Sequence, residues 1–199
     1  MVSSPSDARR QEIIQAVWVL IAGGGIERVT FRRVADQAGV SVGRVQHHFG
    51  TRDALVLAAC ETMIDLAHDR YQDLPEAPEE RLRHILLHAI PDSDRARFGA
   101  SVWHAYLSKS AADEEIAGLL AEAKRGTEEE IARLLEDAGG RGDKLLADGS
   151  LRAARTLLAI ADGLTVRVLI GDLSGAEARG LLLAELRRVR GSTDQGNSP

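Results

Sequence analysis

Apolar residues recur at helical spacing along most of the chain, and β-branched residues are scattered rather than gathered into strand-like runs. The clearest example covers about residues 113–138, where five apolar side chains fall on one helical face. They are Ile116, Leu120, Ala123, Ile131 and Leu135. Glycine pairs and prolines interrupt the pattern and leave about nine segments of ordinary helix length. The pattern therefore predicts an all-α protein of about nine helices.

Turn residues and helix caps set the expected bounds of these helices. Thr30 and Ser41 suit the N-caps of the second and third helices, and Ser174 with Glu177 forms a capping box that opens the ninth. The stretch 141–150 is expected to be a loop. The expected helices cover approximately 6–22, 31–37, 42–48, 52–71, 79–90, 94–110, 113–138, 150–170 and the residues after 174.

Residues 30–49, TFRRVADQAGVSVGRVQHHF, have the pattern of a helix-turn-helix. Gly39 falls in the turn, where a positive φ would penalise any side chain with a Cβ, and Ala35 is small where the two helices cross. The apolar positions that face the partner helix are Val34, Ala38, Val40 and Val45. The alternative is a plain helical hairpin with a glycine turn, but the number of matched positions favours the helix-turn-helix.

A helix-turn-helix places its second helix in the major groove of double-stranded DNA. Arg44 suits guanine or a phosphate, Gln46 suits adenine, and Gly43 permits close approach of the backbone. Arg32 and Arg33 open the preceding helix, near the expected path of a DNA backbone. The full predicted DNA-binding set is Thr30, Arg32, Arg33, Ser41, Val42, Gly43, Arg44, Gln46, His47 and Arg52.

Charge is distributed unevenly along the chain, whose formal net charge is −5 over 199 residues. Residues 1–55 hold seven arginines and five acidic residues, for a net charge of +2, and the remainder carries −7. This polarity suits a protein that docks on DNA by one end, because phosphate repels the acidic part. We expect a helix-turn-helix domain at 1–50, a helical ligand-binding and dimerisation domain at 51–191, and a disordered tail at 192–199.

The first 55 or so residues resemble the tetracycline-repressor (TetR) family of bacterial regulators. The head of that family reads approximately T-x-x-x-[IV]-A-x-x-A-G-V-S-x-G-x-[LV]-Y-x-H-F-x-x-[KR]-x-x-L. Gln46 departs from it by replacing a tyrosine that usually contacts phosphate, and Arg52 replaces the commoner lysine at a position expected to contact phosphate. The matching residues are Thr30, Val34, Ala35, Ala38, Gly39, Val40, Ser41, Gly43, Val45, His48, Phe49, Arg52 and Leu55.

The resemblance implies a homodimeric transcriptional regulator, a repressor that binds a near-palindromic operator and is released by a small-molecule effector. The segment 161–186, ADGLTVRVLIGDLSGAEARGLLLAEL, is similar to the C-terminal part of the branch typified by choline-responsive BetI-like repressors. This similarity implies a branch of the fold and does not imply choline.

An effector cavity is expected around the sixth helix, which is apolar over most of its circumference and must therefore be central. Its aromatic residues either line the cavity or fill the core, and both alternatives stay open. Asp162 either binds a polar effector or, as we favour, pairs internally with Arg155 or Arg167 or caps a crossing helix. The predicted pocket residues are Met63, Phe98, Trp103, Tyr106, Leu120 and Asp162.

The last two helices carry leucine-rich faces that require a cover. In the resembled family these helices form a four-helix bundle with their copies in a second subunit, whereas the alternative is packing inside one subunit alone. The residues predicted at the dimer interface are Leu157, Leu164, Val168, Leu182 and Leu186.

Other function classes find little support in the sequence. No apolar run is long enough to span a bilayer and the N-terminus is polar, so a cytoplasmic protein without membrane contact is expected. Cys60, the single cysteine, excludes an internal disulfide and a cysteine-based zinc site, and suits a core position. His84 and His88 have a chelating spacing, but they lie on the polar side of an amphipathic helix. We expect no metal, no cofactor and no enzymatic activity.

Overall fold

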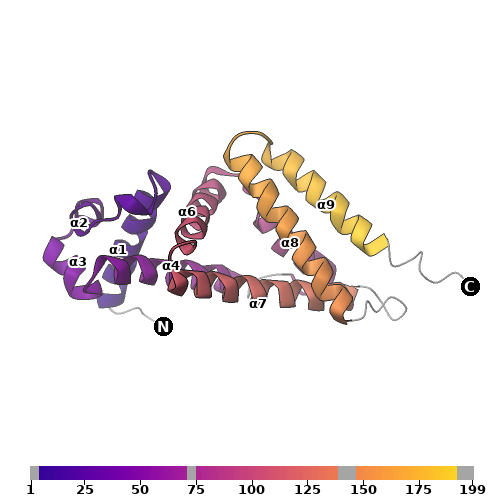
Figure 1. The fold of residues 1–199 in the computed structure, drawn as a ribbon, viewed down its shortest axis with the longest axis horizontal. Coiled ribbons are helices and arrows are strands. Elements are labelled where there is room, and N and C mark those ends of the chain that lie inside the picture. The colour runs from indigo at the N-terminus through magenta and orange to yellow at the C-terminus, as the bar shows by residue number, and fades with distance from the viewer. Residues whose placement is uncertain (1–4, 71–74, 139–146, 192–199) are drawn as a thin grey trace, which may run out of the picture. The chain divides into compact units, whose positions relative to one another are not determined.

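A computed structural model describes residues 5–70, 75–138 and 147–191 of the chain. Within these residues the regular secondary structure is helical, with no strand, as predicted from the sequence (Figure 1). The α-helices are α1 (Pro5–Ala22), α2 (Phe31–Ala38), α3 (Val42–Phe49), α4 (Arg52–Arg70), α5 (Pro78–His88), α6 (Asp94–Ser110), α7 (Glu114–Ala138), α8 (Ala147–Leu169) and α9 (Gly175–Gly191). A 3₁₀ helix, η1 (Ile26–Arg28), joins α1 to α2.

The start of α8 lies three residues before its predicted position. Helix α8 begins at Ala147, so the last four residues of the predicted loop 141–150 are helical and the predicted start at Ser150 is wrong. Ser150 is buried, and tertiary packing of this kind overrides the loop preference of a polar stretch. The 3₁₀ helix was not predicted. The tail 192–199, predicted to be disordered, lies outside the described residues.

The chain divides into two compact units. The first comprises residues 1–69 and 101–120, and the second comprises 70–100 and 121–199, so that α6 and α7 each contribute a part to both. None of the described helices is long and apolar enough to cross a lipid bilayer.

The core of the first unit joins the helix-turn-helix to parts of later helices. Ile13 and Val17 of α1 are fully buried, and the same apolar cluster continues through α4 into α6 and α7. Its members on the later helices are Leu55, Val56, Ala58, Ala59, Cys60, Val102, Tyr106, Ile116 and Leu120. The head predicted at 1–50 is therefore packed into a larger compact unit.

Two side chains of the first unit reach the backbone of α4. Trp18 of α1 donates from Nε1 to the carbonyl oxygen of Ala59 at 3.0 Å, and the Tyr106 hydroxyl of α6 donates to the carbonyl oxygen of Val56 at 2.9 Å. Cys60, the residue after Ala59 on α4, has a buried thiol, and burial raises its pKa to about 12. Helix α4 is therefore fixed by directional bonds as well as by apolar packing.

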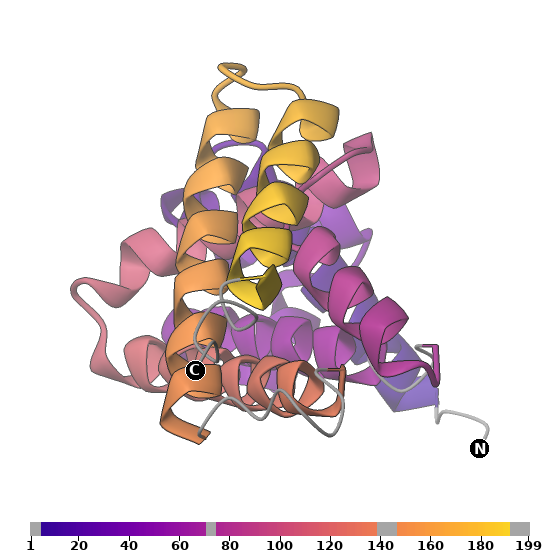
Figure 2. The same cartoon turned by 90° about the vertical axis from the view of Figure 1, so that its right-hand side faces the viewer.

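The core of the second unit lies between α5, α7, α8 and α9. Helices α8 and α9 run side by side, as Figures 1 and 2 both show. Their leucines, together with Ile85 and Leu86 of α5 and Ile131 and Leu135 of α7, form one buried cluster.

The end of α5 and the loop that follows it pack tightly against α8 and the start of α9. Thr165 donates to the carbonyl oxygen of Ala89 at 2.8 Å, and Arg179 donates to that of Leu87 at 3.2 Å. A Cβ on Gly175 would lie 2.5 Å from the Pro91 carbonyl oxygen, closer than real Cβ contacts. Glycine is required at this position because a neighbouring backbone approaches it.

The stability of the second unit is expected to depend on Gly175. A Gly175→Ala substitution should lower the free energy of unfolding by about 1–3 kcal/mol, because the loop backbone must move. Gly99→Ala is the matched control in the same unit: Gly99 is exposed in α6 with no atom within 4 Å of an added Cβ, so this substitution should raise that free energy by up to about 1 kcal/mol. Urea unfolding followed by circular dichroism measures both. An unchanged stability of Gly175→Ala would contradict the tight packing.

Candidate nucleic-acid interface

Local hydrogen bonds build the helix-turn-helix at α2 and α3. The side chains of Thr30 and Ser41 accept hydrogen bonds from the backbone N–H groups of Arg33 and Arg44, each at 3.3 Å, which caps the two helices as predicted. Gly39 ends α2 with a φ of 64°, in the left-handed region that favours glycine.

Buried apolar residues fix the rotation of α3 about its axis. Val34 and Ala35 of α2 and Val45 of α3 are 0–1% exposed, and Phe49 is 9% exposed. With Val45 and Phe49 directed into the core, helical periodicity turns the opposite side of α3 to solvent. The exposed residues on and before this helix are Ser41, Val42, Gly43, Arg44, Gln46 and His47.

The exposed side of α3 has the chemistry for reading base edges. Arg44 and Gln46 offer hydrogen-bonding groups, and Gly43 leaves open space around the backbone. Val42 is 38% exposed, although the other large apolar side chains of the helix-turn-helix are buried or half-buried. An exposed apolar side chain in the first turn is suited to the methyl group of thymine.

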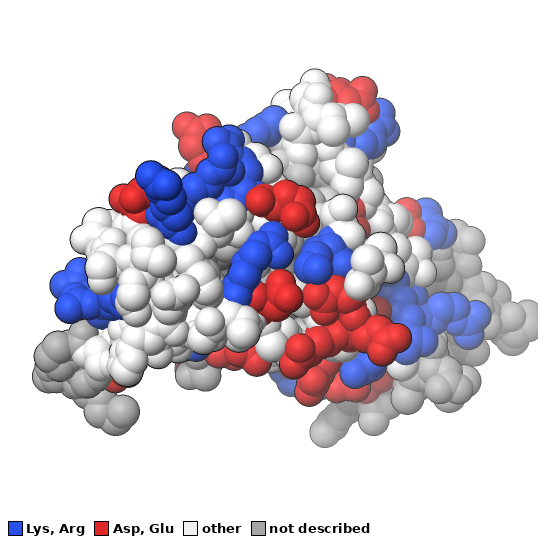
Figure 3. All heavy atoms as spheres, turned by 60° about the vertical axis from the view of Figure 1, so that its left-hand side comes forward, with Lys and Arg blue, Asp and Glu red and all other residues white. Residues whose placement is uncertain are grey.

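Basic side chains accompany this surface. Arg32 and Arg33, in the first turn of α2, are exposed, as is the cap residue Thr30. In the view of Figure 3, basic side chains are spread among large uncharged areas, the largest group of acidic side chains lies at the lower right, and smaller acidic groups lie beside basic ones elsewhere. Arg10 of α1, which sequence reasoning missed, lies over the Phe49 ring with its guanidinium carbon 5.5 Å from the ring centroid. The adjacent residues Arg9 and Arg10 are the sequence feature that could have drawn attention to this side chain.

Arg52 is placed differently from the other predicted DNA-binding residues. Its guanidinium donates to the carbonyl oxygens of Val29 and Ile26, at 2.7 and 3.0 Å. It also forms ion pairs with Glu27 at 3.4 Å and Asp53 at 3.3 Å. The guanidinium of Arg52 is therefore bound by backbone and carboxylate groups of the first unit.

Two known families match the chain in successive stretches. Residues 13–59 match the family described as "Bacterial regulatory proteins, tetR family", and residues 78–191 match "BetI-type transcriptional repressor, C-terminal". The second match alone covers more than half of the chain.

The chain belongs to the TetR family of transcriptional regulators.

Individual TetR-family proteins are similar over most of its length. The HTH-type transcriptional regulator BetI of Stenotrophomonas maltophilia is 31% identical over 174 residues, which cover 85% of this chain and 84% of BetI. A TetR-family structure from Rhodococcus sp. has a TM-score of 0.81 at 28% identity, covering 92% of this chain and 99% of that one. A regulator from Saccharomonospora viridis, solved with choline, has a TM-score of 0.81 at 25% identity, covering 91% and 96%. The family confirms the predicted function class, a DNA-binding regulator rather than an enzyme.

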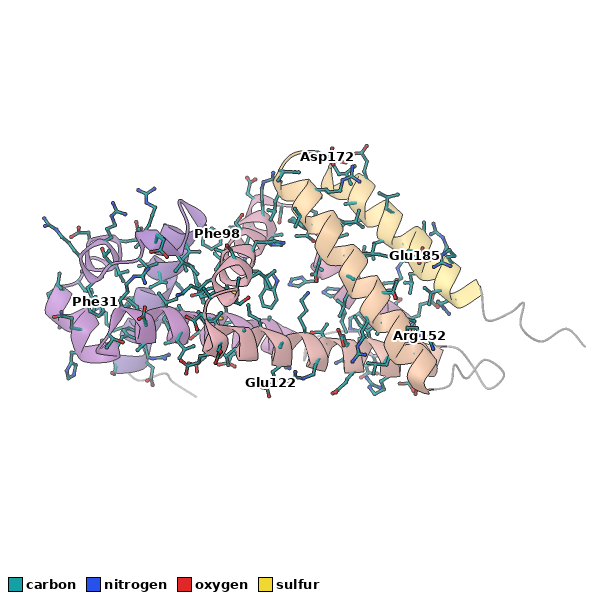
Figure 4. All side chains as sticks on the ribbon, viewed as in Figure 1. Phe31, Phe98, Glu122, Arg152, Asp172 and Glu185 are labelled. Atoms are coloured by element: carbon teal, nitrogen blue, oxygen red, sulfur yellow. The ribbon has the colours of Figure 1, made fainter. Side chains whose placement is uncertain are left out.

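The residues predicted to line an effector pocket fall in both units. Leu120 and Tyr106 are buried in the core of the first unit, and Met63 and Trp103 are partly buried against it. Phe98, labelled in Figure 4, belongs to the second unit and is 38% exposed. Tyr106 is fully buried and its hydroxyl is bonded to Val56, which favours the core alternative for this residue. A ligand contact by Trp103 stays a prediction.

Asp162 pairs internally, as favoured from the sequence, but with another partner. Lys124 of α7 donates to both carboxylate oxygens, at 2.5 and 2.7 Å. The two arginines expected as partners bind elsewhere: Arg155 pairs with Glu128 and Arg167 with Asp172. Sequence reasoning missed Lys124 because the pair joins two helices, and its 38-residue separation leaves no local signal.

The leucine-rich faces predicted at the dimer interface lie inside the second unit. All five residues are at most 8% exposed and pack among α5, α7, α8 and α9, so they leave little surface for a second copy, and their place at a dimer interface stays a prediction. They are Leu157, Leu164, Val168, Leu182 and Leu186. The apolar residues that α8 and α9 leave exposed are Val166, Ile170 and Leu181, at 42, 72 and 51%.

His84 and His88 lie on an exposed part of α5, with ring centroids 6.3 Å apart. Within the described residues no third metal-ligating side chain joins them in a cluster. A cleft of about 490 Å³ lies in the second unit beside Gly175, lined among others by Arg97 and Arg179. Arg97 donates to the carbonyl oxygen of Leu169, and Arg179 pairs with Asp92, so both arginines serve the packing of the loops.

The position of Tyr106 in the core leads to a stability prediction. Tyr106→Phe should lower the free energy of unfolding by about 0.5–1.5 kcal/mol, because one buried hydrogen bond is lost while the ring packing remains. Chemical denaturation at neutral pH measures the change. A variant as stable as the wild type would indicate that the hydroxyl exchanges its bond for one with water, as a cavity-lining tyrosine would.

Proposed function

We propose that the protein is a ligand-responsive repressor that binds a near-palindromic operator in double-stranded DNA as a homodimer. Residues 1–50 read the operator, and the helical body at 51–191 mediates dimerisation and binds a small-molecule effector that releases the DNA. The observation that carries this proposal is the exposed side of α3, with Val42, Arg44 and Gln46 directed outward by the buried opposite side.

Each exposed side chain of the head has a proposed role. Arg44 pairs with guanine, Gln46 with adenine, and Val42 contacts a thymine methyl group. Arg32 and Arg33 bind phosphate at the start of α2 and set the register of the head on the duplex. The remaining predicted contacts are those of Thr30, Ser41, Gly43 and His47, around the same two helix N-termini.

The operator is obtained by selecting DNA fragments from a random pool with the purified protein. Arg44→Ala should weaken binding to the selected fragment by about 1–3 kcal/mol and relax the base preference at one position of each half-site, because a bidentate contact is lost. Arg83→Ala, which removes an exposed arginine on α5, is the matched control and should bind as the wild type does. An unchanged affinity and selection profile for Arg44→Ala would remove this residue from the reading surface.

The dimer is proposed to form through the outer sides of α8 and α9. Val166 and Ile170 are exposed one turn apart on α8, and Leu181 is exposed on α9. Small residues flank them and permit close approach of helices from a second copy: Ala159, Gly163, Gly180 and Ala184. An obligate contact with a second copy explains why these apolar side chains are left exposed within one chain.

Charges placed on this outer side should dissociate the dimer. Ile170→Glu combined with Leu181→Glu is expected to give a monomer at micromolar concentration, because the contact would then bury two carboxylates. Val19→Glu is the control, since Val19 is similarly exposed but belongs to α1. Light scattering measures the mass of each variant. A dimer that persists with both substitutions on α8 and α9 would exclude this interface.

The effector is proposed to bind the BetI-type region, residues 78–191. The similar regulator from Saccharomonospora viridis holds choline, which supports a small-molecule effector of some kind for this chain. Asp162 is already paired with Lys124, so its carboxylate is not a ready counter-ion for a cationic ligand. The coupling between effector and operator needs only about 1–3 kcal/mol.

A further inference from the structure

Arg52 connects the start of α4 to the segment that precedes the helix-turn-helix. Its Nε donates to the carbonyl oxygen of Val29 at 2.7 Å, and its Nη2 donates to the carbonyl oxygen of Ile26 at 3.0 Å. The residues that accept these bonds lie 23 and 26 positions earlier in the chain. The Arg52 side chain therefore connects the first residue of α4 to the segment 26–29, which is distant from it in sequence.

The two residues that accept these hydrogen bonds lie in the short segment immediately before α2. Ile26 begins η1, and Val29 immediately precedes Thr30, the N-cap of α2. The side chains of both residues are buried in the core of the first unit, at 6 and 0% exposure. Fixing their carbonyl groups therefore fixes the point from which α2, and after it α3, departs.

The geometry of these bonds suits a guanidinium and not an ammonium group. Arginine presents several N–H donors in a rigid planar fork, so that two carbonyl oxygens can be bound by two different nitrogens. Lysine carries its three N–H donors on one nitrogen at the end of a flexible stem, so it cannot bind the two oxygens from two separate nitrogens as Arg52 does.

The charges around Arg52 make it a weak ligand for phosphate. Glu27 and Asp53 lie within ion-pair distance, at 3.4 and 3.3 Å, and offset its positive charge. Its side chain is 32% exposed, while the carboxylates beside it are 88 and 85% exposed and face solvent first. DNA that approaches this point therefore meets two negative groups.

We infer that Arg52 is a positioning residue that sets the placement of α2 and α3 on α4 through the backbone at 26–29. It takes this role in place of the phosphate contact expected from its position in the TetR pattern. This inference rests on the proposed reading of DNA by α3.

The test compares Arg52→Lys and Arg52→Ala with Arg32→Ala, using the DNA fragment selected by the wild-type protein. Kd is measured over a range of salt concentrations, at a temperature where thermal melts show each variant to be folded. Both Arg52 variants should weaken binding at least tenfold and leave the slope of log Kd against log salt unchanged. Arg32→Ala, which removes a proposed phosphate contact, should reduce that slope by about one.

Three outcomes would overturn the inference. The first is wild-type affinity for Arg52→Lys, which would show that charge alone suffices. The second is a salt slope for Arg52→Ala reduced by about one, as for a lost phosphate contact. The third is failure of both Arg52 variants to fold, which would assign the residue to global stability. Because Arg44→Ala tests base reading separately, loss of its effect would instead contradict the proposed function.

Discussion

The contact between α2 and α3 across the Gly39 turn determines which side of α3 faces outward, and the DNA-reading role of the protein depends on it. Val34 and Ala35 take the inward side of α2, while Val45 and Phe49 take that of α3. Because each residue advances a helix by about 100°, these four positions leave no choice for the rest of α3. The side that carries Arg44 and Gln46 is outward because the other side is apolar.

The apolar core that contains these residues extends from the helix-turn-helix into α1, α4, α6 and α7 and holds the helix-turn-helix in place. Trp18 of α1 and Tyr106 of α6 bind the carbonyl groups of Ala59 and Val56, three residues apart on α4, and Arg52, the first residue of α4, binds the segment before α2. Helix α4 is thus the element on which the head is assembled. In a protein that must hold a recognition helix at a fixed angle to DNA, rigid attachment reduces the entropy lost on binding.

Local features were predictable from the sequence, and long-range pairings were not. The caps at Thr30 and Ser41 and the turn at Gly39 depend on a few adjacent residues, so their pattern is legible in a single chain. Helical periodicity also identified the apolar side of α8 and α9. Periodicity marks which residues are buried but not which helices cover them. Leu164 and Leu182, predicted to contact a second subunit, already pack against helices of their own chain. The choice of Lys124 as the partner of Asp162 depends on how α7 crosses α8, which no spacing reveals.

Methylation interference tests most directly whether α3 reads the major groove in two half-sites. The fragment selected by the protein is methylated sparsely with dimethyl sulfate, and bound and free molecules are compared. Methylation of guanine N7, in the major groove, should block binding at two clusters related by a two-fold axis, while methylation of adenine N3, in the minor groove, should have little effect. Interference confined to adenine N3, or none at all, would contradict the placement of α3 in the major groove.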